Sequence, residues 1–328
     1  LPTKIKLEAY PDAKIGPSKV AREAAAVYME RAGMEYNPPR KYVKVDEERA
    51  KKIADWYDSV EHNPDDPKVQ ESYQAMMKET LEQWKVIKET GLKVEWITEE
   101  MLDKDGDPYE ESPRLATEDI NRNNHFYVFP TDLGFGTDAE FDPKDNPLFE
   151  LTDEIIDGKQ ARYNDIFRIV HDYFGHVKEG NGFRAFGEEN AWRSHLAMYS
   201  DKAKPAMTME TRGQNSWVNY GPHGEFNRTA SGADTIYADQ KINIPPAWII
   251  NEGAVDPKPA PKRTPKEKKK VKKAGKARVT LTSINRGVKE TFGKGVSVIK
   301  NPDGDGSSFI LKTTRNAEFV LKPDASMV

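Results

Sequence analysis

The chain has 328 residues, a net charge of −4 and no cysteine. Its length suggests about two domains, and its 37% hydrophobic and 32% charged residues are typical of a polar globular protein. The absence of cysteine excludes disulfide bonds and thiolate chemistry. No apolar run approaches the roughly 20 residues that a membrane-spanning helix requires.

The N-terminal half predicts helices separated by clear turn signals. Residues 1–17 show little periodicity and predict an extended arm. Ser18 and Gly33 are the expected start and end of a first helix. Asp46 predicts the start of a second helix, and the apolar spacing from Val69 to Thr90 predicts the longest one.

The middle of the chain predicts short strands among further helices. Alternating residues predict strands at 92–97 and 125–129. Residues 137–160 are acidic and are expected to be mostly loop. Helices are expected at 164–176 and 183–199.

Residues 205–246 are polar and rich in glycine, and we expect an irregular segment. Trp217, Tyr220 and Tyr237 are its expected anchors to the core. An irregular segment of this length inside a compact domain usually has a functional or binding role. The helical main domain is therefore expected to extend over residues 18–256.

The C-terminal part differs in composition from the rest. Residues 257–276 form an expected linker rich in Pro and Lys, followed by a small α+β module over 277–328. In this module we expect strands at 279–281, 296–299, 308–311 and 318–321, a helix over 283–292 and a hairpin turn at 301–306. The predicted fold class is mainly α with small β elements.

Charge is unevenly distributed along the chain. Residues 258–278 contain eleven Lys or Arg and one acid, a local charge of +10, which leaves −14 for the rest. A basic segment attracts nucleic acid whereas an acidic body repels it. DNA contact is therefore expected to be local to this segment, with a solvated spacer as the alternative. The candidate contact residues are Lys268, Lys269, Lys270, Lys272 and Lys273.

Histidines gather in one region. Four of the six lie within residues 171–223, and the run from His171 to His176 is followed by Glu188 and Glu189. Two histidines and one carboxylate form a facial triad that leaves positions open on a metal. The sequence therefore predicts a site for Fe²⁺ or Zn²⁺ at His171, His176 and Glu188.

Helix geometry refines this hypothesis. Five residues correspond to about 140° around an α-helix, so His171 and His176 share a face only if the helix bends or ends near Gly175. Asp172 lies on the same face as His176 and is expected to orient the ligands. His195 lies on the same face as Glu188, and this second carboxylate–histidine pair either completes the site or orients its ligands. The alternative is that these histidines are buried hydrogen-bonding partners of the neighbouring carboxylates.

Residues 210–220 are dense in side chains that bind anions or amides. Arg212 offers bidentate recognition of a substrate, and Arg212 and Glu189 are the candidate catalytic residues. Gln214, Asn215 and Trp217 are the expected wall of a substrate pocket. The alternative is a loop that its own amides attach to the core.

The run from His171 to Val177 resembles the metal-binding segment of the aromatic amino acid hydroxylases, in which His-Glu/Asp-x-Leu/Phe-Gly-His-Val supplies two histidine ligands. The chain departs from that family in two ways. The Pro-Glu-Pro-Asp that precedes the motif is replaced by residues 166–170, and the expected carboxylate is much closer in sequence. The resemblance implies metal geometry alone.

About three quarters of the chain resembles a phage-encoded family of uncharacterised proteins found within long, virion-associated polyproteins. The segments that carry this resemblance are residues 36–40, 125–132, 167–176, 187–195 and 210–217. The chain begins at Leu1, as expected for a processed piece of a larger polyprotein. The resemblance implies a phage setting: the virion, with host cytoplasm during assembly, and other virion proteins as partners.

Two functional hypotheses follow. The first is a phage virion-associated protein, structural or internal and DNA-adjacent, that carries a metal site. The second is a metal-dependent enzyme, either similar to mononuclear non-haem iron oxygenases or hydrolytic.

Overall fold

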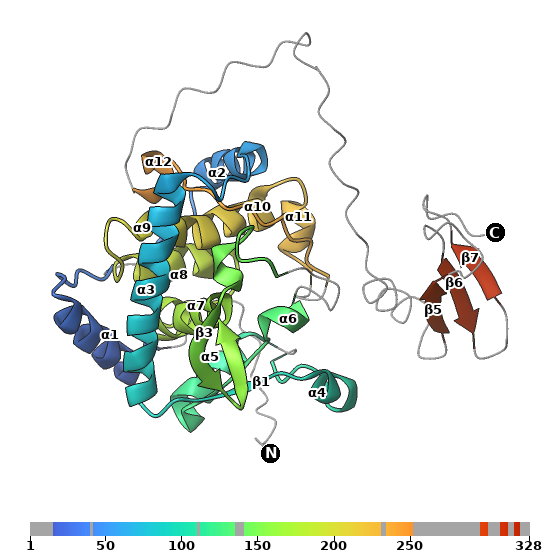
Figure 1. Ribbon diagram of the computed structural model, residues 1–328, viewed down its shortest axis with the longest axis horizontal. Coiled ribbons are helices and arrows are strands. Elements are labelled where there is room, and N and C mark those ends of the chain that lie inside the picture. Colours follow the sequence, from blue (N-terminus) through green and yellow to red (C-terminus); the bar gives the residue numbers. More distant parts are fainter. Residues whose placement is uncertain are drawn as a thin grey trace, which may run out of the picture. The chain divides into compact units, whose positions relative to one another are not determined.

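The structure is a computed structural model that describes residues 16–39, 42–109, 112–134, 141–230 and 234–251, together with three strands in the C-terminal part. The chain divides into two compact units, one ending near Pro257 and one that contains the C-terminal strands. The first unit is mainly helical with small sheets (Figure 1), which confirms the predicted fold class.

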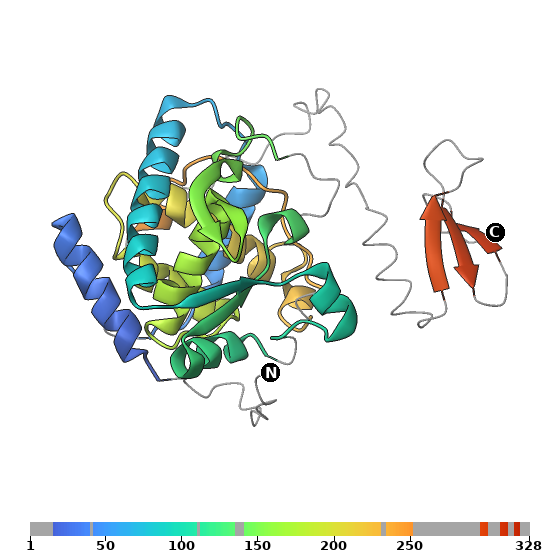
Figure 2. The same cartoon turned by 60° about the horizontal axis from the view of Figure 1, so that its bottom comes forward.

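Three helices lie between residues 19 and 89, and their ends confirm the sequence signals. They are α1 (Lys19–Ala32), α2 (Glu47–Ser59) and α3 (Pro67–Glu89). Ser18 and Asp46 accept hydrogen bonds from backbone N–H groups at the starts of α1 and α2. Gly33 ends α1 in the left-handed region, where glycine lacks the steric penalty of other residues. α1 packs along α3, as both views show (Figures 1 and 2).

Two small sheets adjoin these helices. β1 (Lys93–Trp96) pairs in parallel with β2 (His125–Val128), and the connection between them contains α4 (Glu99–Lys104) and α5 (Arg114–Asn123). β3 (Leu151–Ile156) pairs antiparallel with β4 (Lys159–Arg162). The expectation of loop over residues 137–160 was therefore wrong for this hairpin. Its turn residues, Asp157 and Gly158, both have positive φ, as a tight hairpin turn requires.

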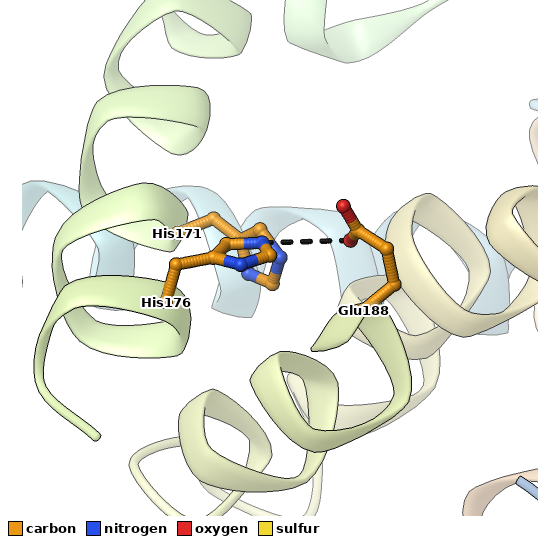
Figure 3. Close-up of side chains that lie close together, drawn as sticks. All are labelled: His171, His176 and Glu188. Carbon is orange, nitrogen blue, oxygen red and sulfur yellow. Dashed lines mark ion pairs between the residues drawn. The ribbon is translucent and has the colours of Figure 1, made fainter. Parts of the chain in front are cut away.

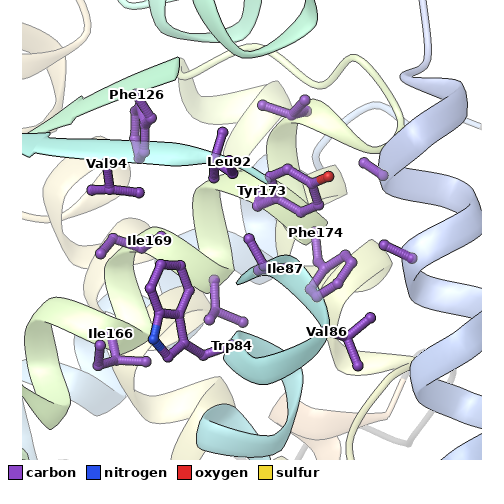
Figure 4. Packing of buried hydrophobic residues seen from close by; sticks show 14 of the residues in the cluster. Trp84, Val86, Ile87, Leu92, Val94, Phe126, Ile166, Ile169, Tyr173 and Phe174 are labelled. Carbon is purple, nitrogen blue, oxygen red and sulfur yellow. The ribbon is translucent and has the colours of Figure 1, made fainter. Parts of the chain in front are cut away.

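The central layer carries the histidine run. α7 (Tyr163–His171) continues directly into a π-helix, η2 (Asp172–Val177), and α8 (Ala185–Leu196) packs against it. α3 packs on α7. Figure 4 shows the apolar core between these elements, in which Trp84 and Ile87 of α3 meet Ile169 of α7 and Phe174 of η2. This packing holds the histidine run rigidly inside the unit.

Most of residues 204–227 are helical, which corrects the expected irregular segment. They form α9 (Lys204–Thr208), a second π-helix η3 (Met209–Gly213), α10 (Gln214–Tyr220) and α11 (Gly224–Asn227). Irregular chain is confined to the region before α12 (Ala247–Ile250). Tyr237 is 68% exposed and therefore is not the predicted core anchor.

Two short elements complete the first unit, α6 (Thr131–Gly134) and the 3₁₀ turn η1 (Pro147–Phe149). The second unit contains an antiparallel sheet with the order β5 (Val296–Lys300), β6 (Phe309–Thr313) and β7 (Glu318–Leu321). The predicted strands at 296–299, 308–311 and 318–321 are thus confirmed. The predicted strand at 279–281, helix at 283–292, turn at 301–306, basic linker and most of the N-terminal arm lie outside the described residues.

No helix in the described part of the chain combines the length and apolar character needed to cross a membrane.

Candidate metal centre

The π-helix, rather than a break at Gly175, brings the two histidines onto one face. Its backbone hydrogen bonds span five residues: Lys178 N–H donates to Tyr173 O at 2.9 Å, and Asn181 N–H to His176 O at 2.9 Å. In such a turn, residues five apart stack as residues four apart do in an α-helix. The predicted bend is therefore replaced by a wider helical turn, and His171 and His176 face the same side.

Gly175 has a packing role in this turn. A Cβ at this position would lie 3.0 Å from His171 Cε1 and 3.1 Å from Ala191 O in α8. Contacts this short are tighter than ordinary van der Waals packing, so a side chain here would displace the imidazole or α8. Glycine thus allows the His171 ring to lie flat between η2 and α8.

Three side chains converge at this point. One ligand atom each from His171, His176 and Glu188 lie within 4.8 Å of one another. His176 Nε2 is 3.4 Å from Glu188 Oε2 (Figure 3). His171 and His176 are buried, and the Glu188 side chain is 17% exposed. The sequence-predicted ligand set is therefore assembled in space from two neighbouring elements.

The donor set and spacing fit a single divalent ion. Metal–ligand distances of about 2.0–2.2 Å in a tetrahedral site place ligand atoms about 3.4 Å apart. The His176–Glu188 pair already has this spacing, and the three ligand atoms lie within 4.8 Å of one another. Two imidazole nitrogens and one carboxylate oxygen suit Zn²⁺ or Fe²⁺. The three residues could therefore hold a metal ion.

In each of the two histidines, the hydrogen bond made by one ring nitrogen shows which nitrogen is left to bind a metal. His176 Nδ1 lies 3.1 Å from Gly182 O, so it carries a proton, and Nε2 is the nitrogen that faces Glu188 and is left for a metal. His171 Nδ1 lies 3.0 Å from His195 Nδ1. His171 Nε2 is buried and has no hydrogen-bond partner. Buried polar atoms are usually paired, so this nitrogen is the atom that a metal would satisfy.

Gly187 is required for the His176 anchor. A Cβ on Gly187 would lie 1.7 Å from Gly182 O, the oxygen that accepts from His176. α8 therefore approaches the 182 backbone more closely than any side chain would permit. This close approach holds the acceptor where it orients the His176 ring.

The electrostatics of the cluster favour an uncharged His171 and a His176 that forms an ion pair with Glu188. Burial, with a contribution from His176, lowers the pKa of His171 to about 3. Burial also acts to lower the pKa of His176, but the Glu188 carboxylate outweighs it and the pKa is raised. Burial acts to raise the pKa of Glu188, but His176 outweighs it and the pKa is lowered. Without a metal, a proton shared between His176 and Glu188 thus occupies the position that the metal cation would take.

Aromatic rings and a small cavity surround the ligands. The Phe183 ring stacks on His176 with centroids 4.1 Å apart, and Phe167 stacks on His171 at 6.0 Å. Beside Glu188 lies a cavity of about 10 Å³, enough for about one water molecule, whose wall includes Asn215 and Tyr220. The ligands are therefore bordered by aromatic rings and, beside Glu188, by a small cavity.

The structure places some of the other predicted residues at the ligands. Asn215 Nδ2 donates to Glu188 Oε2 at 2.9 Å, and His195 contacts His171. Asp172 is partly buried and interacts electrostatically with His176, and burial raises its pKa to about 6. By contrast, Gln214 donates to Glu210 and Trp217 to Asp58, so these hydrogen bonds are not with a ligand.

Arg212 and Glu189, the candidate catalytic residues, are paired with each other. Arg212 Nε and Nη2 both donate to the Glu189 carboxylate, and Nη1 donates to Ile249 O at 2.7 Å. The guanidinium also lies 4.0 Å from the Trp192 ring centre. Arg212 thus joins α8, η3 and α12. This arrangement corresponds to the structural alternative for residues 210–220, although these residues form helix instead of loop.

Two groups at the site were not expected from the sequence. Gln83 of α3 lies 2.8 Å from His195 Nε2 through its Oε1, and Gly182 supplies a backbone oxygen. Gln83 is more than 80 residues from the histidine run, and no local pattern marks it. Gly182 belongs to a Gly-Asn-Gly turn, but its carbonyl direction is set only by packing. The five lysines from Lys268 to Lys273 lie outside the described residues.

Comparisons with protein-family models, curated proteins and solved structures found nothing that matches this chain.

Proposed function

We propose that this protein binds one divalent cation, Zn²⁺ or Fe²⁺, at His171, His176 and Glu188, and that it acts as a mononuclear metalloenzyme. The observation that carries this proposal is the buried His171 Nε2 without a hydrogen-bond partner, close to a second imidazole and a carboxylate. If the histidines served only as buried hydrogen-bonding groups, this nitrogen would be expected to have a partner.

Three protein ligands leave coordination positions for a substrate or water, as catalytic sites do and closed structural sites do not. A metal held here would polarise a substrate oxygen, activate water or bind oxygen. Asp172 interacts electrostatically with His176 and would help to orient the ligands. Phe167 and Phe183 would exclude bulk water from the ligands.

Elemental analysis tests the metal site directly. Protein purified without chelator is expected to carry about one metal per chain, and His171→Ala and His176→Ala are expected to lose it. His223→Ala is the matched control, since His223 is exposed and outside the cluster. Equal metal content in all four proteins, or metal-free wild type that does not take up Zn²⁺ or Fe²⁺, would contradict the proposal.

A phage setting is a separate proposal that rests on the sequence segments given above and on the charge of +10 over residues 258–278. In this proposal the protein is carried in the virion, and the lysines of the basic segment contact packaged DNA. Mass spectrometry of purified particles should detect the protein. DNA affinity should fall steeply with salt, and replacement of the five lysines from Lys268 to Lys273 by Gln should weaken it. Absence from particles would rule out the virion role.

A further inference from the structure

A chain of hydrogen bonds leads from His171 to the long helix α3. His171 Nδ1 lies 3.0 Å from His195 Nδ1 in α8, and His195 Nε2 lies 2.8 Å from Gln83 Oε1 in α3. Gln83 and His195 are both fully buried. Three side chains from three packed helical elements are therefore linked, and the chain ends at the unpartnered His171 Nε2.

The amide of Gln83 determines the donor and the acceptor in both hydrogen bonds that link Gln83, His195 and His171. Gln83 is placed with Oε1 toward His195 and with its own Nε2 buried and without a hydrogen-bond partner. In this orientation the amide oxygen only accepts, so His195 Nε2 carries a proton and donates to Gln83. Neutral His195 then has a lone pair on Nδ1, which can only accept from His171. His171 must therefore carry its proton on Nδ1. Its Nε2 is left with a lone pair and no partner.

We propose that Gln83 and His195 are positioning residues that hold His171 as the Nδ1–H tautomer and so present its Nε2 lone pair to the metal. The importance of this relay for metal binding rests on the proposed function, but the tautomer itself is a property of the metal-free protein. Metal-binding histidines commonly donate their second N–H to a partner that fixes ring orientation. Here the partner is another histidine whose own tautomer is set by an amide.

The rings of the relay are held in place by aromatic neighbours. Phe167 stacks on His171 with centroids 6.0 Å apart and on His195 at 6.3 Å, with interplanar angles of 19° and 24°. Tyr199 lies 4.8 Å from the His195 ring.

A reversed Gln83 amide would present N–H groups to His195 and reverse the direction of both hydrogen bonds in the relay. The proton would then reside on His171 Nε2 and block the metal.

The tautomer can be measured without any metal. Long-range ¹H–¹⁵N correlation spectra of the full chain, stripped of metal, report which ring nitrogen carries the proton. We expect a protonated Nδ1 and an unprotonated Nε2 for His171, and the opposite arrangement for His195. A protonated His171 Nε2 in wild type overturns the relay, whether or not the protein binds metal.

Substitution of Gln83 tests the effect on binding. Gln83→Leu removes the acceptor, and we expect Zn²⁺ affinity, measured by competition with a chromophoric chelator, to fall about 10–100-fold. Gln83→Glu keeps an acceptor at the same place and should restore wild-type binding. Ser72→Ala is the matched control, since Ser72 is also buried in α3 but its hydroxyl bonds the backbone of Lys202 and Ala206 instead of the relay.

The outcomes separate the relay from the metal site. Loss of affinity in Gln83→Leu, with binding retained in Gln83→Glu and Ser72→Ala, supports the relay. Unchanged affinity in a folded Gln83→Leu protein, checked by its circular dichroism, overturns it. If Gln83→Leu fails to fold, the tautomer of His171 in the wild-type protein decides whether the relay is present. If wild type has the expected tautomer but binds no metal, the proposed function fails and the relay stands.

Discussion

Glu210 is a carboxyl group whose charge is unfavourable in the folded state. Burial raises its pKa to about 7, although hydrogen bonds from Tyr73 and Gln214 act in the opposite direction. The hydrogen bonds at its two oxygens come from Tyr73 Oη and Gln214 Nε2, and neither of these donors is a cation. Between the pKa of Glu210 in the unfolded chain and its pKa in the folded protein, the folded protein therefore keeps a proton on Glu210 that the unfolded chain has lost.

The stability should depend on pH through this residue. Between the unfolded pKa near 4.5 and the folded pKa near 7, the native state binds more protons, so the free energy of unfolding falls as pH rises. We expect Glu210→Gln to be more stable than wild type at pH 8, by on the order of 2 kcal/mol, and to lose this advantage at pH 4. Urea unfolding of both proteins from pH 4 to pH 8 measures the difference. A pH-independent difference would contradict the assignment.

Arg212 and Glu189 form a buried pair, in which loss of one charge leaves the other unpaired. Their side chains are 6% and 12% exposed. Arg212→Ala should lower the free energy of unfolding by about 3–5 kcal/mol. The control is Arg31→Ala, because Arg31 and its partner Glu89 are each 54% exposed and such pairs contribute about 1 kcal/mol or less. Similar losses for both variants would show that burial is not the cause.

At the scale of elements, π-helical turns set the directions of side chains in two places. η2 turns His176 toward His171, and η3 carries Glu210 and Arg212 between α9 and α10. Each π-helix lies within a longer helical stretch, so one wider turn changes which residues share a face without ending the helix. α8 packs against both π-helices and supplies Glu188 and Glu189.

The close approach of α8 to the backbone at Gly182 makes a specific prediction. Gly187→Ala should lower the free energy of unfolding by about 1–3 kcal/mol or more, because its Cβ would overlap Gly182 O. The displaced carbonyl would also release His176 and weaken metal binding. Chemical denaturation and chelator competition measure the two effects. Gly16→Ala, where a Cβ meets nothing within 4 Å, should change stability by less than about 0.5 kcal/mol.

At the scale of the whole molecule, metal binding should be linked to folding, because the ligands come together only in the folded unit. At a metal concentration of 100 times Kd the folded state gains about 2.7 kcal/mol, which corresponds to a rise in Tm on the order of 5–10 °C. Calorimetry with Zn²⁺ and with chelator measures this shift. His223→Ala should respond as wild type does, whereas His171→Ala should not respond.

Metal affinity should also depend on pH, because the metal replaces a proton on His176. The pKa of His176 is raised by Glu188, so the proton competes over a higher pH range than for an ordinary histidine. Below this pKa, affinity should rise about tenfold per pH unit, and it should level off above it. Titrations with Zn²⁺ from pH 5 to pH 8 give the slope. Affinity that does not change with pH would exclude His176 as a ligand.

Local sequence signals were sufficient for much of the fold. Ser18, Asp46 and Gly33 marked helix ends, and apolar spacing identified α3. These predictions succeeded because caps and helical periodicity depend on residues within one or two turns of each other. The β3–β4 hairpin was missed even though Asp157-Gly158 is a local turn signal, since the acidic composition around it suggested loop.

The sequence by itself determined that His171, His176 and Glu188 were candidate ligands, because residue types and short spacings are local properties. Only the tertiary structure decided how they meet. The π-helix of η2, the glycine contact between α8 and residue 182, and the link to Gln83 all depend on packing between elements distant in sequence. The same packing paired Arg212 with Glu189, since a buried charge requires a partner whose position no local pattern encodes.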